Sequence, residues 1–177
     1  RGEVKGVTIV DIDEKSIAKV GQFPWRRDVY SKILKNLNQH NPKAIAFDIV
    51  FSEEDKQNPK DLLLQLQKES NQLIDVEVLD TNKVFVDSIK NSKIILPILG
   101  EPNDNFVKNE SKPKARIIAK GENPKNFIYK FKNKIISLEE ISSAASGIGS
   151  ISLIPNIDGV IRNVPVLYNI DNRIWPS

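Results

Sequence analysis

Cysteine is absent from this chain and histidine occurs once, and these two shortages exclude several kinds of chemistry. Without cysteine there are no disulfides, no thiolate metal sites and no cysteine nucleophile. His40 lies beside Asn41 and Pro42, at the expected end of a helix. A histidine-rich metal site is therefore excluded, and a Ser-His-Asp triad would depend on this one histidine. We expect no metal and no cofactor.

Long apolar runs are also missing. No segment has enough consecutive apolar residues to span a bilayer. The best run, residues 94–99, is short, contains Pro97 and predicts a buried strand. No signal peptide is present, and the chain begins with Arg1, almost inside a strand. We therefore expect this chain to be a piece of a longer protein.

The composition is that of an ordinary globular domain. The 177 residues are 40% hydrophobic and 28% charged, which fits one domain spanning residues 1–177. The formal charge of +3 comes from scattered lysines rather than from a dense basic stripe. We therefore do not expect nucleic-acid binding.

The first fifty residues predict a βαβ unit. Residues 7–10 form an apolar strand, and residues 44–51 form a second one. Between them lies an amphipathic helix with Asp28 as its N-cap and with Val29, Ile33 and Leu37 on one face, which ends at residues 38–42. A right-handed crossover would make the two strands parallel neighbours.

The remaining segments complete an α/β pattern. Helices are expected after Pro59 and around residues 84–89, strands at 93–99 and 126–131, and a helix from Ser137 with a capping box to Glu140. Residues 101–125 are polar and predict a flexible insertion. Two strands, 150–154 and 160–168, flank a turn at Asp158 and Gly159. We predict a mixed, largely parallel sheet built from βαβ units, with flanking helices and a C-terminal β-hairpin.

Three carboxylates lie where the two leading strands end. Asp11 and Asp13 follow the first strand, and Asp48 lies inside the second, where an unpaired charge would be costly. If the strands are parallel, these groups meet at the sheet edge where open α/β sheets place ligands. The alternative is structural: Asp11 and Asp13 cap a short helix at residues 16–20, and Asp48 pairs with an arginine.

The obvious counter-charges are Arg27 and Arg162. Arg27 follows Trp25 in a rigid, amphipathic corner, and Arg162 follows the turn at Asp158. A closed ion-pair network would lock the strands to these turns. A pocket rim would instead use Trp25 and the guanidinium groups to hold an anionic or polar ligand. Both interpretations remain open at this point.

An ordered set of motifs resembles the CHASE2 domain, an extracytoplasmic sensory module of bacterial membrane-bound signalling proteins. The resemblance is carried by residues 10–16, by Gly21 with residues 23–25 and Arg27, by residues 46–51, by Gly147 and by residues 158–162. Residues 100–135 carry none of it. Arg26 departs from the family, in which proline or a small residue is common.

This resemblance implies a sensory input domain without catalysis on the periplasmic, extracytoplasmic face of the inner membrane. It implies tethering through flanking helices and a cytoplasmic output such as an adenylate or guanylate cyclase or a histidine kinase. Partners would be a small ligand or a periplasmic protein, and we expect a homodimer in the full-length protein. Two alternatives stand beside it: an interaction or dimerisation domain without a small ligand, and a magnesium-dependent phosphohydrolase using Asp11 and Asp13.

Overall fold

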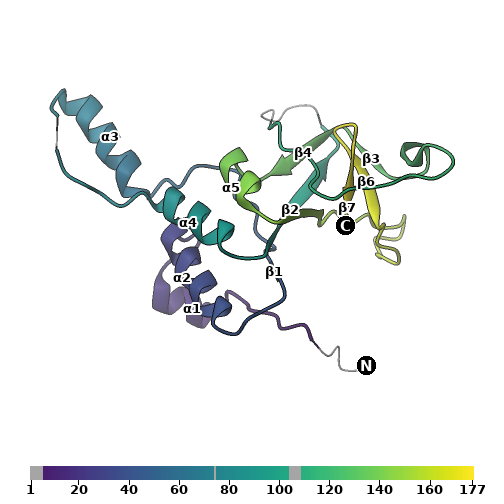
Figure 1. Ribbon diagram of the computed structural model, residues 1–177, viewed down its shortest axis with the longest axis horizontal. Coiled ribbons are helices and arrows are strands. Elements are labelled where there is room, and N and C mark those ends of the chain that lie inside the picture. The colour runs from purple at the N-terminus through teal and green to yellow at the C-terminus, as the bar shows by residue number, and fades with distance from the viewer. Residues whose placement is uncertain (1–5, 74, 104–108) are drawn as a thin grey trace.

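The computed structural model describes residues 6–73, 75–103 and 109–177 (Figure 1). Its helices are α1 (Glu14–Val20), α2 (Arg27–Asn38), α3 (Pro59–Ser70), α4 (Thr81–Lys90) and α5 (Glu139–Ala144), with a 3₁₀ turn at Pro124–Asn126. Its strands are β1 (Ile45–Ala46), β2 (Ile94–Glu101), β3 (Lys130–Phe131), β4 (Asn133–Ile136), β5 (Gly147–Ser150), β6 (Leu167–Ile170) and β7 (Arg173–Pro176).

Strand β2 is the centre of the main sheet. It pairs in parallel with β1 and β5 and antiparallel with β4. A second sheet joins β3, β6 and β7, in which β6 and β7 form an antiparallel hairpin. The predicted α/β class, with a mixed sheet, flanking helices and a C-terminal hairpin, is confirmed.

The position of that hairpin was predicted wrongly. Its two-residue turn is Asp171 and Asn172, whose φ angles of 51° and 56° suit a tight hairpin connection. Asp158 and Gly159 do form a turn, closed by the Gly159 N–H donating to the Asn156 carbonyl over 2.8 Å. Of the two strands predicted beside that turn, only Ser150 and residues 167–168 belong to strands, to β5 and β6 respectively, and residues 151–166 form none.

The second predicted strand is only two residues long, and Pro97 gives the physical reason. The N–H of Phe47 donates to the carbonyl of Ile95 over 3.0 Å. In a parallel ladder the next bond would run from the N–H of residue 97 to the carbonyl of Phe47. Proline has no N–H, so the ladder ends there and β1 stops at Ala46.

The first predicted strand does not join the sheet. Residues 7–10 have no ladder partner in the described part of the chain, and Val7, Ile9 and Val10 are 71%, 87% and 61% exposed. Because β1 has only two residues, its outer edge is too short to pair with a further strand. Residues 7–10 therefore have no strand edge there to join. The predicted βαβ unit is therefore wrong in its first strand, although its helix forms as α2.

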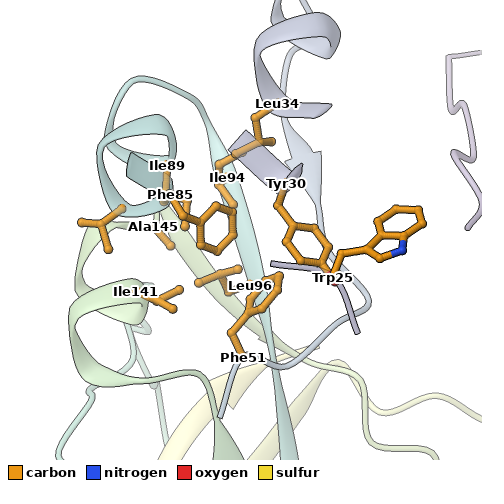
Figure 2. Close-up of a cluster of buried hydrophobic side chains, with 11 residues drawn as sticks. Trp25, Tyr30, Leu34, Phe51, Phe85, Ile89, Ile94, Leu96, Ile141 and Ala145 are labelled. Carbon is orange, nitrogen blue, oxygen red and sulfur yellow. The ribbon is translucent and has the colours of Figure 1, made fainter. Parts of the chain in front are cut away.

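The larger hydrophobic cluster lies between β2 and helices α2, α4 and α5 (Figure 2). Its centre is aromatic: the ring centroids of Tyr30 and Phe51 are 5.1 Å apart, and those of Phe51 and Phe85 are 4.9 Å apart. Leu34 and Ile89, one turn further along α2 and α4, are completely buried. The predicted amphipathic stripe of α2 thus faces this cluster.

The smaller cluster lies where β2 meets the hairpin. It contains Ile98, Ile148, Tyr168 and Trp175, all buried. Both polar ring groups find acceptors, since the Tyr168 hydroxyl donates to the Ser152 carbonyl and Trp175 Nε1 donates to the Ile170 carbonyl over 3.1 Å. The hairpin is therefore fixed to the main sheet by a core of its own.

Helix α3 differs from the other helices because it lies apart from both clusters. It contains no buried residue, and it projects away from the sheet at one end of the molecule (Figure 1). Its leucines Leu62, Leu64 and Leu66 are about half exposed. Within the described ranges, no helix is both long enough and apolar enough to cross a bilayer.

Helix α5 begins later than the capping-box pattern predicts. Leu138 is its N-cap and makes no side-chain capping bond. The Ser137 hydroxyl instead accepts a hydrogen bond from the N–H of Phe51 over 3.0 Å. Because its hydroxyl accepts this long-range hydrogen bond, Ser137 does not cap α5. The bond instead joins Phe51, which follows β1 in the sequence, to the residue just before the N-cap of α5.

Candidate functional site

Asp13 caps a helix, as the structural alternative predicted. Its Oδ1 accepts from the Ser16 N–H over 2.9 Å and from the Ser16 hydroxyl over 2.7 Å. The side-chain hydrogen bond from Ser16 lowers the pKa of Asp13. Asp11, two residues earlier, is exposed and forms no ion pair with any described residue. The two carboxylates are therefore not brought together around a common partner.

Arg27 is buried, and it does not meet the carboxylates predicted for it. Its Nη2 donates to the Glu53 carbonyl over 2.7 Å, and its guanidinium carbon lies 4.5 Å from the centre of the Phe51 ring. Burial lowers the pKa of Arg27. The guanidinium thus packs on Phe51 of the larger hydrophobic cluster and donates a hydrogen bond to the loop that follows this residue.

Arg162 and Asp158 pair with each other on the surface. Arg162 Nη1 and Nη2 donate to the two Asp158 carboxylate oxygens over 2.9 and 2.7 Å, and both side chains are about half exposed. The hydrogen bond from Arg162 lowers the pKa of Asp158. This local pair satisfies Arg162 within its own turn.

The predicted network among Asp11, Asp13, Asp48, Arg27 and Arg162 is therefore not formed. Asp48 follows the end of β1, where its side chain is exposed and needs no buried counter-charge. The prediction assumed two long parallel strands, and the short ladder at Pro97 removes that assumption.

Trp25 is a core residue rather than part of a pocket rim. It is 7% exposed, and its Nε1 donates to the Gly21 carbonyl over 2.7 Å. Its ring lies 6.3 Å from that of Phe23 and 6.4 Å from that of Tyr30, centroid to centroid. Figure 2 shows Trp25 at the margin of the larger hydrophobic cluster, beside Tyr30. Its indole therefore closes the core beneath the α1–α2 corner.

Arg162 and Asp158 line a shallow, open cavity of about 680 Å³ together with Tyr129 and residues 154–157. Ile157 in its wall is fully exposed. The only charged groups in this wall neutralise each other, so the cavity offers a ligand little specific polar recognition.

A second cavity, of about 540 Å³, lies at the base of α3, and we call it the α3-base cavity. Its lining combines the loop before α3 with the first turns of α3, α4 and α5. Five carboxylates contribute to it, those of Glu54, Asp55, Asp61, Asp80 and Glu140. Lys56 is the one cation in the lining, and Leu62 is the one apolar side chain.

Asp55 holds this region together. Buried at 8% exposure, its Oδ2 accepts from the N–H of Arg27 over 2.9 Å and from the Thr81 hydroxyl over 2.8 Å. One carboxylate oxygen thereby accepts a free N–H at the start of α2 and binds the first side chain of α4. Asn58 adds a parallel link, because its Oδ1 accepts from the N–H of Thr81 over 3.0 Å.

The remaining carboxylates are in different electrostatic states. A hydrogen bond from Lys60, 2.8 Å from Nζ to Oδ2, lowers the pKa of Asp80. Burial, followed by repulsion from Glu54, Asp80 and Asp61, raises the pKa of Glu140. Negative charge is therefore crowded at the Glu140 side of the cavity. No group of three or more acidic or histidine side chains among the described residues is arranged to hold a metal ion.

Reasoning from sequence missed this cavity. No sequence motif singled out Glu54, Asp55 or Asp80. The available signal was the repeated pattern of a polar cap before a helix, in Asn58 before Pro59 and in Asp80 before Thr81. Their convergence depends on contacts between residues more than twenty positions apart, such as Asn58 with Thr81.

Comparison with known protein families gives the class of this domain. The CHASE2 domain matches residues 1–177, the whole chain. The chain therefore belongs to the CHASE2 domain family, a family of extracytoplasmic sensory domains. None of the curated proteins and none of the solved structures compared with the chain matches it.

Proposed function

We propose that this chain is the ligand-sensing input domain of a bacterial membrane receptor, with no catalysis of its own. It lies on the periplasmic side of the inner membrane, tethered through flanking helices, and it controls a cytoplasmic cyclase or histidine kinase. The observation that carries this proposal is the family match over the whole chain. The α3-base cavity supports it, since its volume lies within the range of small-molecule sites, about 300–1,000 Å³.

The cavity is well placed to change the packing of helices. Its walls come from four elements, and Asp55 in its lining also bonds to the first turn of α2. A ligand that binds one arrangement of these elements better than another shifts the population toward it. The free energy by which the ligand shifts this equilibrium is limited by the difference between its binding free energies to the two arrangements.

The full-length receptor provides the test. We expect hydrophobic spans and a cyclase or kinase domain in the sequence that flanks the chain in its gene. The 177-residue chain is then screened by thermal shift against amino acids, nucleotides, sugars, anions and amines, because a ligand of the native state raises the melting temperature. Each stabilising compound is applied to membranes containing the receptor, and its output activity is measured. Flanks without spans, or stabilising compounds that never change the output, would contradict the proposal.

The phosphohydrolase alternative is tested separately. The Asp13 carboxylate is engaged at the α1 cap, and the exposed Asp11 pairs with none of the residues that the structure describes. We expect no turnover of a chromogenic phosphate ester with magnesium. Turnover that Asp11→Asn abolishes would replace the sensor with an enzyme.

Helix α3 favours a second, compatible role in dimerisation of the full-length protein. Three half-exposed leucines follow one another on a helix that packs on neither core. Because the chain has no cysteine, Leu66→Cys introduces a single thiol into it. We expect a crosslinked dimer in membranes from Leu66→Cys and none from Lys32→Cys, an exposed polar position on α2. Equal crosslinking at both positions would refute a role for α3.

A further inference from the structure

Basic residues are concentrated in one segment of the chain. Residues 112–134 contain eight lysines or arginines and one acid, Glu122. The net charge of this segment exceeds the +3 of the whole chain, so the rest of the sequence is acidic on balance. The expectation of scattered lysines is therefore wrong for this segment, where positive charge is gathered.

Several of these cations have no counter-ion. Lys134 is buried in an ion pair, and Lys114 donates to backbone carbonyls at the end of α5. Arg116, Lys120 and Lys130, in contrast, are exposed and form no ion pair with any described residue. The fold does not use the charge of these three side chains, so they are free to attract an anionic partner.

Large apolar side chains lie close to these cations. Phe127 and Tyr129 are 71% and 54% exposed. Ile157, in the turn that precedes β6, is fully exposed and lines the same shallow cavity as Tyr129. Figure 1 shows the segment before β3 and the loop before β6 at the end of the molecule opposite α3. We call this surface the basic face, and it consists of Arg116, Lys120, Phe127, Tyr129, Lys130 and Ile157.

The chemistry of the basic face favours a lipid surface. Cations beside exposed apolar side chains are typical of surfaces that bind at a bilayer interface, where the charges attract anionic headgroups and the apolar groups enter the acyl boundary. A nucleic acid would engage the cations and stack on the rings, but it offers no apolar medium to an isoleucine in a turn. A small anion would need an unpaired cation in the shallow cavity, and Arg162, the one cation of its lining, is paired with Asp158.

We propose that the basic face docks on the surface of a bilayer that contains anionic phospholipids. Arg116, Lys120 and Lys130 lie at the level of the headgroup phosphates, and Phe127 and Ile157 enter the boundary with the acyl chains. This inference goes beyond the sensing of a ligand and uses only the proposed position of the domain beside a membrane. Tethering gives the bilayer a high effective concentration, so a weak contact is enough to fix the orientation of the domain.

Sedimentation of the 177-residue chain with sucrose-loaded vesicles tests this contact at about 0.15 M ionic strength, where attraction between distant exposed charges is largely screened. One set of vesicles contains equal parts of phosphatidylglycerol and phosphatidylethanolamine, and the other contains phosphatidylcholine alone. We expect saturable binding to the anionic vesicles that is about tenfold or more tighter than binding to the neutral ones. Absence of this preference would reject the proposal.

Charge substitutions separate the basic face from the rest of the surface. Arg116→Gln, Lys120→Gln and Lys130→Gln together should weaken binding to the anionic vesicles by about tenfold or more, because each basic residue near such a surface contributes to binding. The control removes the same charge from exposed positions on α2, α3 and α4, and should bind nearly as the wild type does. Equal losses in the two variants would contradict docking through this face. The control variant is Lys35→Gln, Lys68→Gln and Lys83→Gln.

A fluorescent dye reports whether apolar side chains enter the bilayer. Because the chain has no cysteine, Ile157→Cys accepts a single polarity-sensitive dye, and Leu66→Cys, at an exposed apolar position on α3, provides the control. With anionic vesicles we expect a blue shift of the emission from the first protein and none from the second. Unchanged emission from Ile157→Cys while the vesicles are bound, or an equal shift in both proteins, would overturn the proposal.

Two further results have a defined meaning. Saturable binding of a single-stranded oligonucleotide that is tighter than binding of the anionic vesicles would assign the basic face to nucleic acid and reject the lipid surface. If the vesicle tests fail while a ligand found by thermal shift changes receptor output, the sensory function stands and only this inference fails. Circular dichroism confirms that each variant is folded.

Discussion

Helices α2 and α3 are both twelve residues long, yet one is part of the core and the other is not. α2 buries five residues, among them Tyr30 and Leu34, whereas α3 buries none. Both contain several apolar side chains, so composition does not separate them. The difference is the presence of a partner: α2 packs on α4 and on the aromatic residues that follow β1, and α3 projects beyond them (Figure 1).

This comparison has a functional meaning. Most of the stability of a helix in a protein comes from packing its apolar face. A helix without such packing opens at low free energy, and mobile binding elements are drawn from such regions. The α3-base cavity lies between α3, which has no core packing, and the first turns of α4 and α5, which have it.

The sharpest test substitutes leucine by alanine on both helices. Leu34→Ala removes a completely buried side chain and should reduce the free energy of unfolding by about 2–5 kcal/mol. Leu64→Ala, at 46% exposure, should change it by less than about 0.5 kcal/mol. Urea unfolding measures both. Similar losses in the two variants would mean that α3 is packed after all.

The next test removes the Asp55 carboxylate, which links the first turns of α2 and α4. Asp55→Ala leaves the Arg27 N–H and the Thr81 hydroxyl without their acceptor. We expect a loss of about 1.5–3 kcal/mol in the free energy of unfolding, since the lost bonds involve a buried charged group. Asp87→Ala, at an exposed acid, should be nearly neutral. An unaffected Asp55→Ala protein would show that α2 and α4 do not depend on this link.

A smaller effect distinguishes the acids by pH. Arg26 donates to Asp28 over 2.6 Å and lowers the pKa of this carboxyl below its ordinary 3.8. The charged form therefore stabilises the fold above pH 3.8, and this contribution is lost as the pH falls through the lower folded pKa. Asp28→Asn should cost about 1 kcal/mol at pH 7. Urea titrations at pH 7 and pH 2.5 should show the difference shrinking at the lower pH, and a constant difference would contradict the assignment.

The smallest effect has the opposite sign and belongs to the α3-base cavity. Burial and neighbouring carboxylates raise the pKa of Glu140 above its ordinary 4.5. Its ionisation therefore removes stability as the pH rises from 4.5 through the folded pKa. Glu140→Gln should raise the free energy of unfolding at pH 7, by less than about 0.5 kcal/mol, and have no effect near pH 3.5. A decrease at pH 7 would mean that Glu140 has an attractive partner.

The helices were predictable because their signals are local. The spacing of Val29, Ile33 and Leu37 predicted α2, although the observed N-cap, Arg26, lies two residues before the predicted one, Asp28. Asp13 as a helix cap was one of two open alternatives, and it does cap α1. The resemblance to the CHASE2 family was also correct over the whole chain.

The strands and the cavity were not predictable in the same way. Whether residues 44–51 remain a strand depends on what Pro97, about fifty residues later, can offer their carbonyls. The role of Asp55 depends on α2 and α4 arriving at one loop from opposite directions in the sequence. Such contacts between distant residues leave no periodic trace in a single chain.

Pro97 has one more effect on the sheet. Along the same edge of β2, β1 ends just before this residue and β4 begins to pair at Ile98, so a parallel neighbour is exchanged for an antiparallel one. Growth of β1 past Phe47 would leave a carbonyl oxygen without a donor, whatever the helices above it are doing. The pyrrolidine ring therefore acts as a fixed stop, and a rearrangement at the cavity end of the molecule must travel through helix packing rather than by sliding of strands.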